Sequence, residues 1–141
     1  MIADKRRAIR RLRPHHIERF KRLARAYAEV YFYLGHVHGA INQCGRTARG
    51  FISSYGKTVN QSRRLPLMHT ICLRGHRRRF PHWHRWHAEQ TKTPSKAVHI
   101  IVRWGDWTVD FTRRQFDPKA PFPFFQHIDD VRKDWKIVRA E

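Results

Sequence analysis

The chain has 141 residues, and its 40% hydrophobic and 13% aromatic content excludes a disordered protein and favours one compact domain with its own core. The formal net charge of +19 indicates a surface that attracts nucleic acid, anionic membranes or acidic proteins. Two cysteines are too few for a disulfide framework, and no apolar run has the length of a membrane span or forms the core of a signal peptide. We therefore expect a cytoplasmic protein, or one delivered into a target cell without a classical signal peptide.

Residues 1–13 are predicted to form a basic arm ahead of a single domain that spans residues 14–141. The arginines that the arm would offer to nucleic acid or to an acidic partner are Arg6, Arg7, Arg10 and Arg11. Pro14 suits the first turn of a helix, and apolar residues then recur at spacings of three and four as far as Leu34, before a stop at Gly35. This pattern predicts a helix that packs by one face and exposes a basic outer face. A DNA recognition helix is the alternative.

A second helix is predicted from Cys44 to Tyr55, after a loop over residues 35–43 and before Gly56. A thiol in a first helical turn lies beside unpaired backbone N–H groups and the positive end of the helix dipole, which lower its pKa. Cys44 is thus a candidate nucleophile, and an inert buried residue on an apolar helix face is the alternative. Cys72 falls within a strand predicted over residues 65–74, where a buried structural thiol is expected.

Residues 75–96 interleave arginines with aromatic residues and histidines. Arginines and indole rings in such an arrangement can bind phosphates and stack on bases. The residues chosen for this role are Arg77, Arg78, Arg79, Trp83 and Trp86. A short helix and loop covering the active-site side of the sheet is the alternative. The histidines of this stretch suggest zinc, but the sequence lacks a CxxC pair and an HExxH motif, so we assign no metal and no other cofactor.

Residues 97–112 predict a β-hairpin, because two strand-like runs flank the turn-forming pair Gly105-Asp106. With a two-residue turn, His99 and Asp110 lie almost opposite each other, where an imidazole and a carboxylate can bond. The prolines that follow, between residues 118 and 123, exclude a long helix or a central strand there. The fold predicted is α+β, with N-terminal helices packed on a small antiparallel sheet and Cys44 at a helix tip facing the hairpin.

Cys44, His99 and Asp110 would form a triad in which a thiol attacks, an imidazole moves the proton and a carboxylate orients the imidazole. Their chain order resembles that of papain-like and transglutaminase-like thiol enzymes. The block from His99 to Phe116, HIIVRWGDWTVDFTRRQF, resembles the His and Asp segment of small papain-like toxin and effector domains. This resemblance implies a papain-like cysteine hydrolase, acting as a peptidase, amidase or protein deamidase on a protein or peptide-like substrate. The basic surface would recruit an acidic substrate.

The oxyanion formed by such a reaction needs hydrogen-bond donors, and the backbone N–H of Cys44 is one candidate. In papain-like enzymes a glutamine a little upstream of the cysteine supplies another, and His38 occupies the matching offset here. Asn42 and Gln43 lie closer to Cys44 than that pattern requires. Gln115 is interpreted as a structural or substrate-facing side chain.

The alternative function is a basic nucleic-acid-binding protein without catalytic activity. In that interpretation the arm, the first helix and the Arg-Trp-His stretch contact phosphates, and the thiol is incidental.

Overall fold

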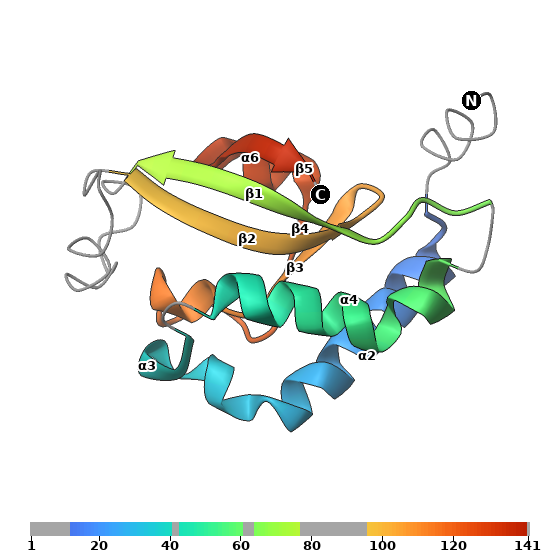
Figure 1. Cartoon of the computed structure of the whole chain (residues 1–141), viewed down its shortest axis with the longest axis horizontal. Coiled ribbons are helices and arrows are strands. Elements are labelled where there is room, and N and C mark those ends of the chain that lie inside the picture. The colour runs from blue at the N-terminus through green and yellow to red at the C-terminus, as the bar shows by residue number, and fades with distance from the viewer. Residues whose placement is uncertain (1–11, 41–42, 61–63, 77–95, 141) are drawn as a thin grey trace.

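The computed structural model describes residues 12–40, 43–60, 64–76 and 96–140, and these form an α+β fold (Figure 1). Its helices are α2 (Pro14–Val30), α3 (Val37–Ala40), α4 (Cys44–Asn60) and α6 (Ile128–Asp134), with the 3-10 turns η1 (Phe32–Gly35) and η3 (Arg113–Gln115). Its strands are β1 (His69–His76), β2 (Lys96–Trp104), β3 (Trp107–Asp110), β4 (Phe124–His127) and β5 (Lys136–Ala140). The strands make one antiparallel sheet in the order β4-β3-β2-β1-β5. The coarse prediction of helices packed on a small antiparallel sheet is confirmed.

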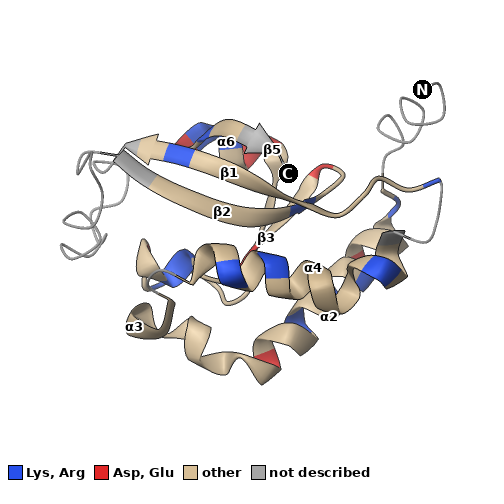
Figure 2. Ribbon diagram, in the orientation of Figure 1, with Lys and Arg blue, Asp and Glu red and all other residues tan. Residues whose placement is uncertain are grey.

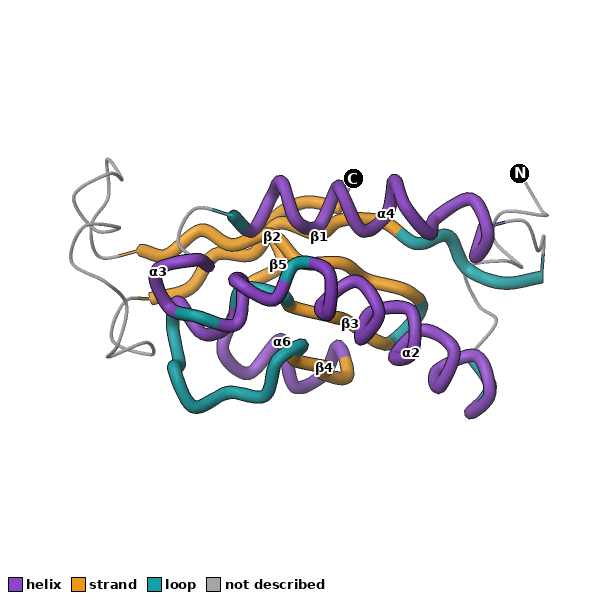
Figure 3. The backbone as a smooth tube through the Cα atoms, turned by 90° about the horizontal axis from the view of Figure 1, so that it is seen from below, coloured by secondary structure: helices purple, strands orange, loops and turns teal. Residues whose placement is uncertain are grey.

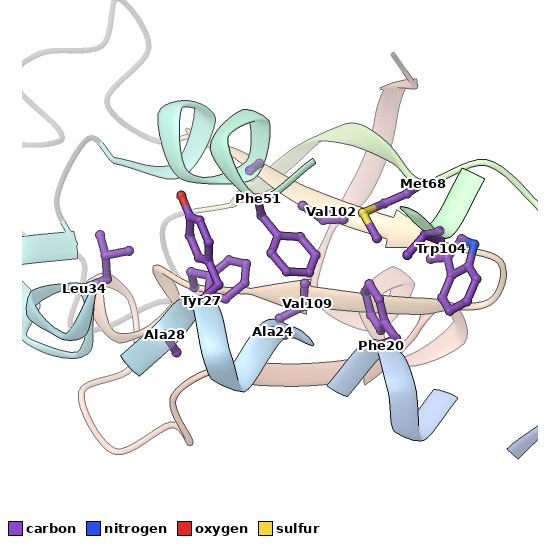
Figure 4. Packing of buried hydrophobic residues seen from close by; sticks show 13 residues of the cluster. Phe20, Ala24, Tyr27, Ala28, Leu34, Phe51, Met68, Val102, Trp104 and Val109 are labelled. Atoms are coloured by element: carbon purple, nitrogen blue, oxygen red, sulfur yellow. The ribbon is translucent and has the colours of Figure 1, made fainter. Parts of the chain in front are cut away.

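The sheet separates two apolar cores, with α2 and α4 on one face and α6 on the other (Figure 1, Figure 3). The larger core joins α2 to α4 through aromatic rings (Figure 4). Phe20 lies 6.1 Å from Phe51 and 5.6 Å from Trp104, measured between ring centroids. The Trp104 indole donates to the carbonyl of Pro66 at 2.8 Å, which satisfies its one polar group inside the core.

Both long helices end at other residues than the sequence predicts, because the burial of apolar side chains, and not a glycine, determines where each helix ends. The first helix ends at Val30, and Leu34 is buried from η1 instead. The second helix does not stop at Gly56 but continues to Asn60, which brings Val59 into the larger core. A glycine within a helix costs only about 1 kcal/mol relative to alanine, and burying a valine recovers more than that.

The basic face of α2 is partly used in packing. The Lys21 amine lies 5.0 Å from the ring centroid of Trp107, and the Arg25 guanidinium lies 5.7 Å from that of Phe125. These cation–π contacts attach the outer side of α2 to β3 and β4. In the part of the chain that the structure describes, no helix is long and apolar enough to cross a bilayer.

Candidate active site

The β2–β3 hairpin brings His99 and Asp110 into contact. Gly105 adopts φ +60°, a conformation that glycine reaches without strain, so the turn between the strands is tight. The paired residues run from Trp104 opposite Trp107 to Val102 opposite Val109, and the pairing ends there. Beyond that point His99 Nε2 donates to Asp110 Oδ2 at 2.7 Å, and both side chains are buried.

The contact is diagonal across the two strands rather than direct. Continuing the observed register would place Asp110 opposite Ile101, two residues from His99. The expectation that the two residues lie almost opposite each other is confirmed, with an offset of two positions. Diagonal neighbours lie about 7–8 Å apart at their Cα atoms, a gap that an imidazole and a carboxylate can bridge.

A second set of hydrogen bonds holds the carboxylate. Asp110 Oδ1 accepts from the backbone N–H of Thr112 at 2.9 Å and lies 3.4 Å from the Thr112 hydroxyl. Gln115 Nε2 in turn donates to that hydroxyl at 3.0 Å. Each carboxylate oxygen thus has its own partner, which fixes the orientation of Asp110. Gln115 is buried in this network, in agreement with a structural role.

Two aromatic rings enclose the imidazole. The centroid of the His99 ring lies 4.8 Å from that of Phe116, edge to face, and 5.3 Å from that of Trp135. His99 itself is fully buried. The rings leave the imidazole little freedom to turn away from Asp110.

Cys44 occupies the first position of α4, beside β2. The helix begins where Thr47 N–H donates to the carbonyl of Gln43 at 2.9 Å, so the N–H groups of the first turn have no partner within the helix. Gly45 lets this end of the helix approach the sheet closely, since a Cβ there would lie 3.3 Å from Ile100 Cδ1. The thiol interacts with the side chain of His99 and with the backbone N–H of Ile100.

The surroundings of Cys44 and His99 shift the pKa values of these two groups in opposite directions. Burial raises the pKa of the Cys44 thiol, but the hydrogen bond and positive charge of His99, with the Ile100 N–H, lower it below its ordinary value in spite of Asp110. Burial lowers the pKa of His99, yet the charge and hydrogen bond of Asp110, with a smaller contribution from Cys44, raise it to about 9. Both directions favour a thiolate beside an imidazolium at neutral pH. Because Asp110 holds Nε2, Nδ1 is the ring nitrogen that remains to exchange a proton with the Cys44 thiol.

The other predicted site residues are distributed differently. His38 lies exposed on α3, and Gln43 immediately precedes the cysteine. Asn42 lies outside the described residues, as do all the residues chosen for nucleic-acid or acidic-partner contacts. Cys72 lies on β1 but is partly exposed, so its expected burial was wrong. In the described ranges no group of three or more His, Cys, Asp or Glu side chains is arranged to hold a metal ion.

Sequence reasoning missed the residues that support the pair. Thr112 follows Asp110 by two positions, the spacing at which an aspartate side chain accepts from the backbone two residues later, so this signal was available. The roles of Phe116 and Trp135 had no comparable local signal, because each depends on long-range packing.

Three comparisons with known proteins were made for the whole chain. It matches no known protein family, no curated protein and no solved structure.

Proposed function

We propose that this protein is a cysteine-dependent amide hydrolase of papain-like type, in which Cys44 attacks, His99 transfers the proton and Asp110 orients His99. The observation that carries the proposal is the buried 2.7 Å contact between His99 and Asp110, with the Cys44 thiol at a helix start interacting with the same imidazole. A histidine with a purely structural role would not need to lower the pKa of a neighbouring thiol. A cysteine with a purely structural role would not need an imidazole that a carboxylate orients.

The reaction follows from these positions. The Cys44 thiolate attacks the carbonyl carbon of an amide, a C–S bond forms, and the carbonyl electrons move onto oxygen. The oxyanion then collapses, the C–N bond breaks, and the imidazolium of His99 gives its proton to the departing amine. Neutral His99 next takes a proton from water, which attacks the thioester and releases the acid and the thiolate.

The start of α4 offers stabilisation for the oxyanion. Its first N–H groups have no partner within the helix, and the helix dipole adds positive potential at the same end. Donors of this kind are worth about 3–4 kcal/mol in the transition state of acyl transfer. Peptidases, amidases and protein deamidases share these steps, and the formal charge of +19 favours an acidic substrate.

The test is the pH dependence of Cys44 alkylation by iodoacetamide, measured by mass spectrometry in a Cys72→Ser background. We expect an apparent thiol pKa well below the ordinary value of about 8.5, and a return towards that value in His99→Ala. His69→Ala is the matched control, because His69 also lies on a strand but, among the described residues, its side chain bonds only to the Leu67 carbonyl, at 3.1 Å. Circular dichroism confirms that each variant is folded, and His99→Gln replaces His99→Ala if the latter is not. A folded variant without His99 whose thiol still titrates as in the parent refutes the proposal.

A further inference from the structure

A second feature lies away from the thiol, where β5 and the end of α6 border a solvent-open cavity of about 850 Å³. Five of its lining residues are cationic and one is acidic: Arg74, Arg103, Arg132, Lys133, Lys136 and Asp134. They come from β1, β2, α6 and β5, and Figure 2 shows basic positions on these elements. Residues distant in sequence thus give this cavity a net positive charge.

Three of these cations form no ion pair with another described residue. Arg132 and Lys133 pair along α6 with Asp129 at 3.4 Å and Asp130 at 2.9 Å. Asp134 is itself within 3.7 Å of Arg113. Within the ranges that the structure describes, Arg74, Arg103 and Lys136 form no ion pair.

Arg103 shows the electrostatic cost of this arrangement. Its side chain is partly buried, with Nε donating to the Gly105 carbonyl at 2.7 Å. Burial and the neighbouring Arg132 lower its pKa, and Asp106 compensates only in part. An anion in the cavity would relieve this repulsion.

Arg74 and Lys136 lie directly opposite each other on β1 and β5, so their side chains project from the same face of the sheet. An extended peptide with acidic residues at alternate positions presents its carboxylates to one face in the same way.

One wall of the cavity is an open sheet edge. β5 is the last strand of the sheet and pairs only with β1 among the described strands. Its outer backbone groups pair with no other described strand, and such an edge can accept a further strand. Val138 on β5 is 42% exposed, which adds apolar surface beside the cations.

We propose that the β5 side of this cavity binds an extended acidic peptide segment, which adds to the edge of β5 and places its carboxylates against Arg74 and Lys136. Backbone hydrogen bonds to β5 would give affinity, and the cations would give the preference for acidic residues. The inference is independent of the chemistry of Cys44, so it can hold where the hydrolase proposal fails, and the reverse.

The test is fluorescence anisotropy with a labelled eight-residue peptide of alternating glutamate and valine, at about 0.15 M salt to screen long-range attraction. The full-length chain is compared with Arg74→Glu/Lys136→Glu. The control is Arg22→Glu/Lys57→Glu, which makes the same change in net charge at exposed positions of α2 and α4. We expect the cavity variant to weaken binding at least about tenfold and the control to change it less than about threefold.

Two further probes identify the type of ligand. A peptide methylated on alternate backbone nitrogens should bind at least about tenfold more weakly, because it cannot complete the ladder with β5. Equal weakening by both charge reversals, or unchanged binding of the methylated peptide, overturns the proposal. It is also overturned if an eight-nucleotide single strand binds as tightly as the peptide and depends equally on Arg74 and Lys136, since the cavity would then be a polyanion site.

Discussion

Replacing Asp110 by asparagine should uncouple the imidazole from the thiol while preserving the size of the side chain. The carboxylate is the main reason that the pKa of His99 rises to about 9 against the effect of burial. The difference from the ordinary 6.5 corresponds to about 3 kcal/mol of preference for the imidazolium. Without that charge, burial should take the pKa of His99 to 6.5 or lower, so the protonated fraction near pH 7.5 falls from nearly complete to about a tenth or less.

The consequence for Cys44 has a definite sign. The imidazolium lowers the pKa of the thiol, whereas the charge of Asp110 itself raises it more weakly. Removing both effects should therefore raise the pKa of Cys44, and alkylation near pH 6.5–7 should slow by about tenfold or more. An asparagine amide can also donate to Nε2, which would leave His99 in the tautomer that carries its proton on Nδ1.

Two measurements check this reasoning in a Cys72→Ser background. Titration of ¹⁵N-histidine-labelled protein by NMR reports the pKa of His99, whose signals are assigned by their loss in His99→Gln. Iodoacetamide rates at Cys44 report the thiol. Asp117→Asn is the control, because within the described ranges that carboxylate accepts only from Lys119 N–H, at 3.1 Å. If Asp110→Asn leaves both titrations as in the parent, Asp110 does not control the pair.

Two other substitutions test the surroundings of the site. Thr112→Val removes the hydroxyl that joins Gln115 to Asp110 but keeps the backbone N–H. We expect the free energy of unfolding, measured in urea titrations, to fall by about 1–3 kcal/mol. The pKa of Cys44 should move less than in Asp110→Asn. A stability equal to that of the parent would contradict the role given to the hydroxyl. Gly39→Ala should lower the free energy of unfolding by about 1–3 kcal/mol, since the new Cβ would meet the Tyr33 carbonyl oxygen. The control Ser53→Ala, on the exposed side of α4, should change that free energy by less than about 0.5 kcal/mol. Thermal melts of these two variants that coincide would show that α3 can move away from η1 without cost.

The sequence was most informative where local rules govern structure. Alternating residues around Gly105 indicated the hairpin, because turn geometry fixes the register of short antiparallel pairs. Helix ends were less predictable: Gly56 looked like a stop, but tertiary packing of Val59 extends α4. The cavity beside β5 could not be foreseen, since it depends on placing Arg103 and Lys136 together across the sheet.

The same distinction applies to the candidate site. The contact between His99 and Asp110 follows from the predicted hairpin. Its diagonal offset could be known only once the structure showed where the pairing of β2 with β3 ends. The approach of Cys44 depends on how α4 docks on β2, and Gly45 was not recognised as the residue that permits it. The rings of Phe116 and Trp135 reach His99 only after the second core has assembled.

The sequence separations of these contacts have a consequence for how the protein folds. His99 and Asp110 are 11 residues apart and belong to one hairpin, so they can meet early in folding. Cys44 lies 55 positions before His99 and reaches it only when α4 docks on the sheet. In a nascent or partly folded chain the thiol should therefore keep the pKa and the reactivity of an ordinary cysteine, and its enhanced reactivity at neutral pH becomes a sensitive reporter of the α4–β2 interface.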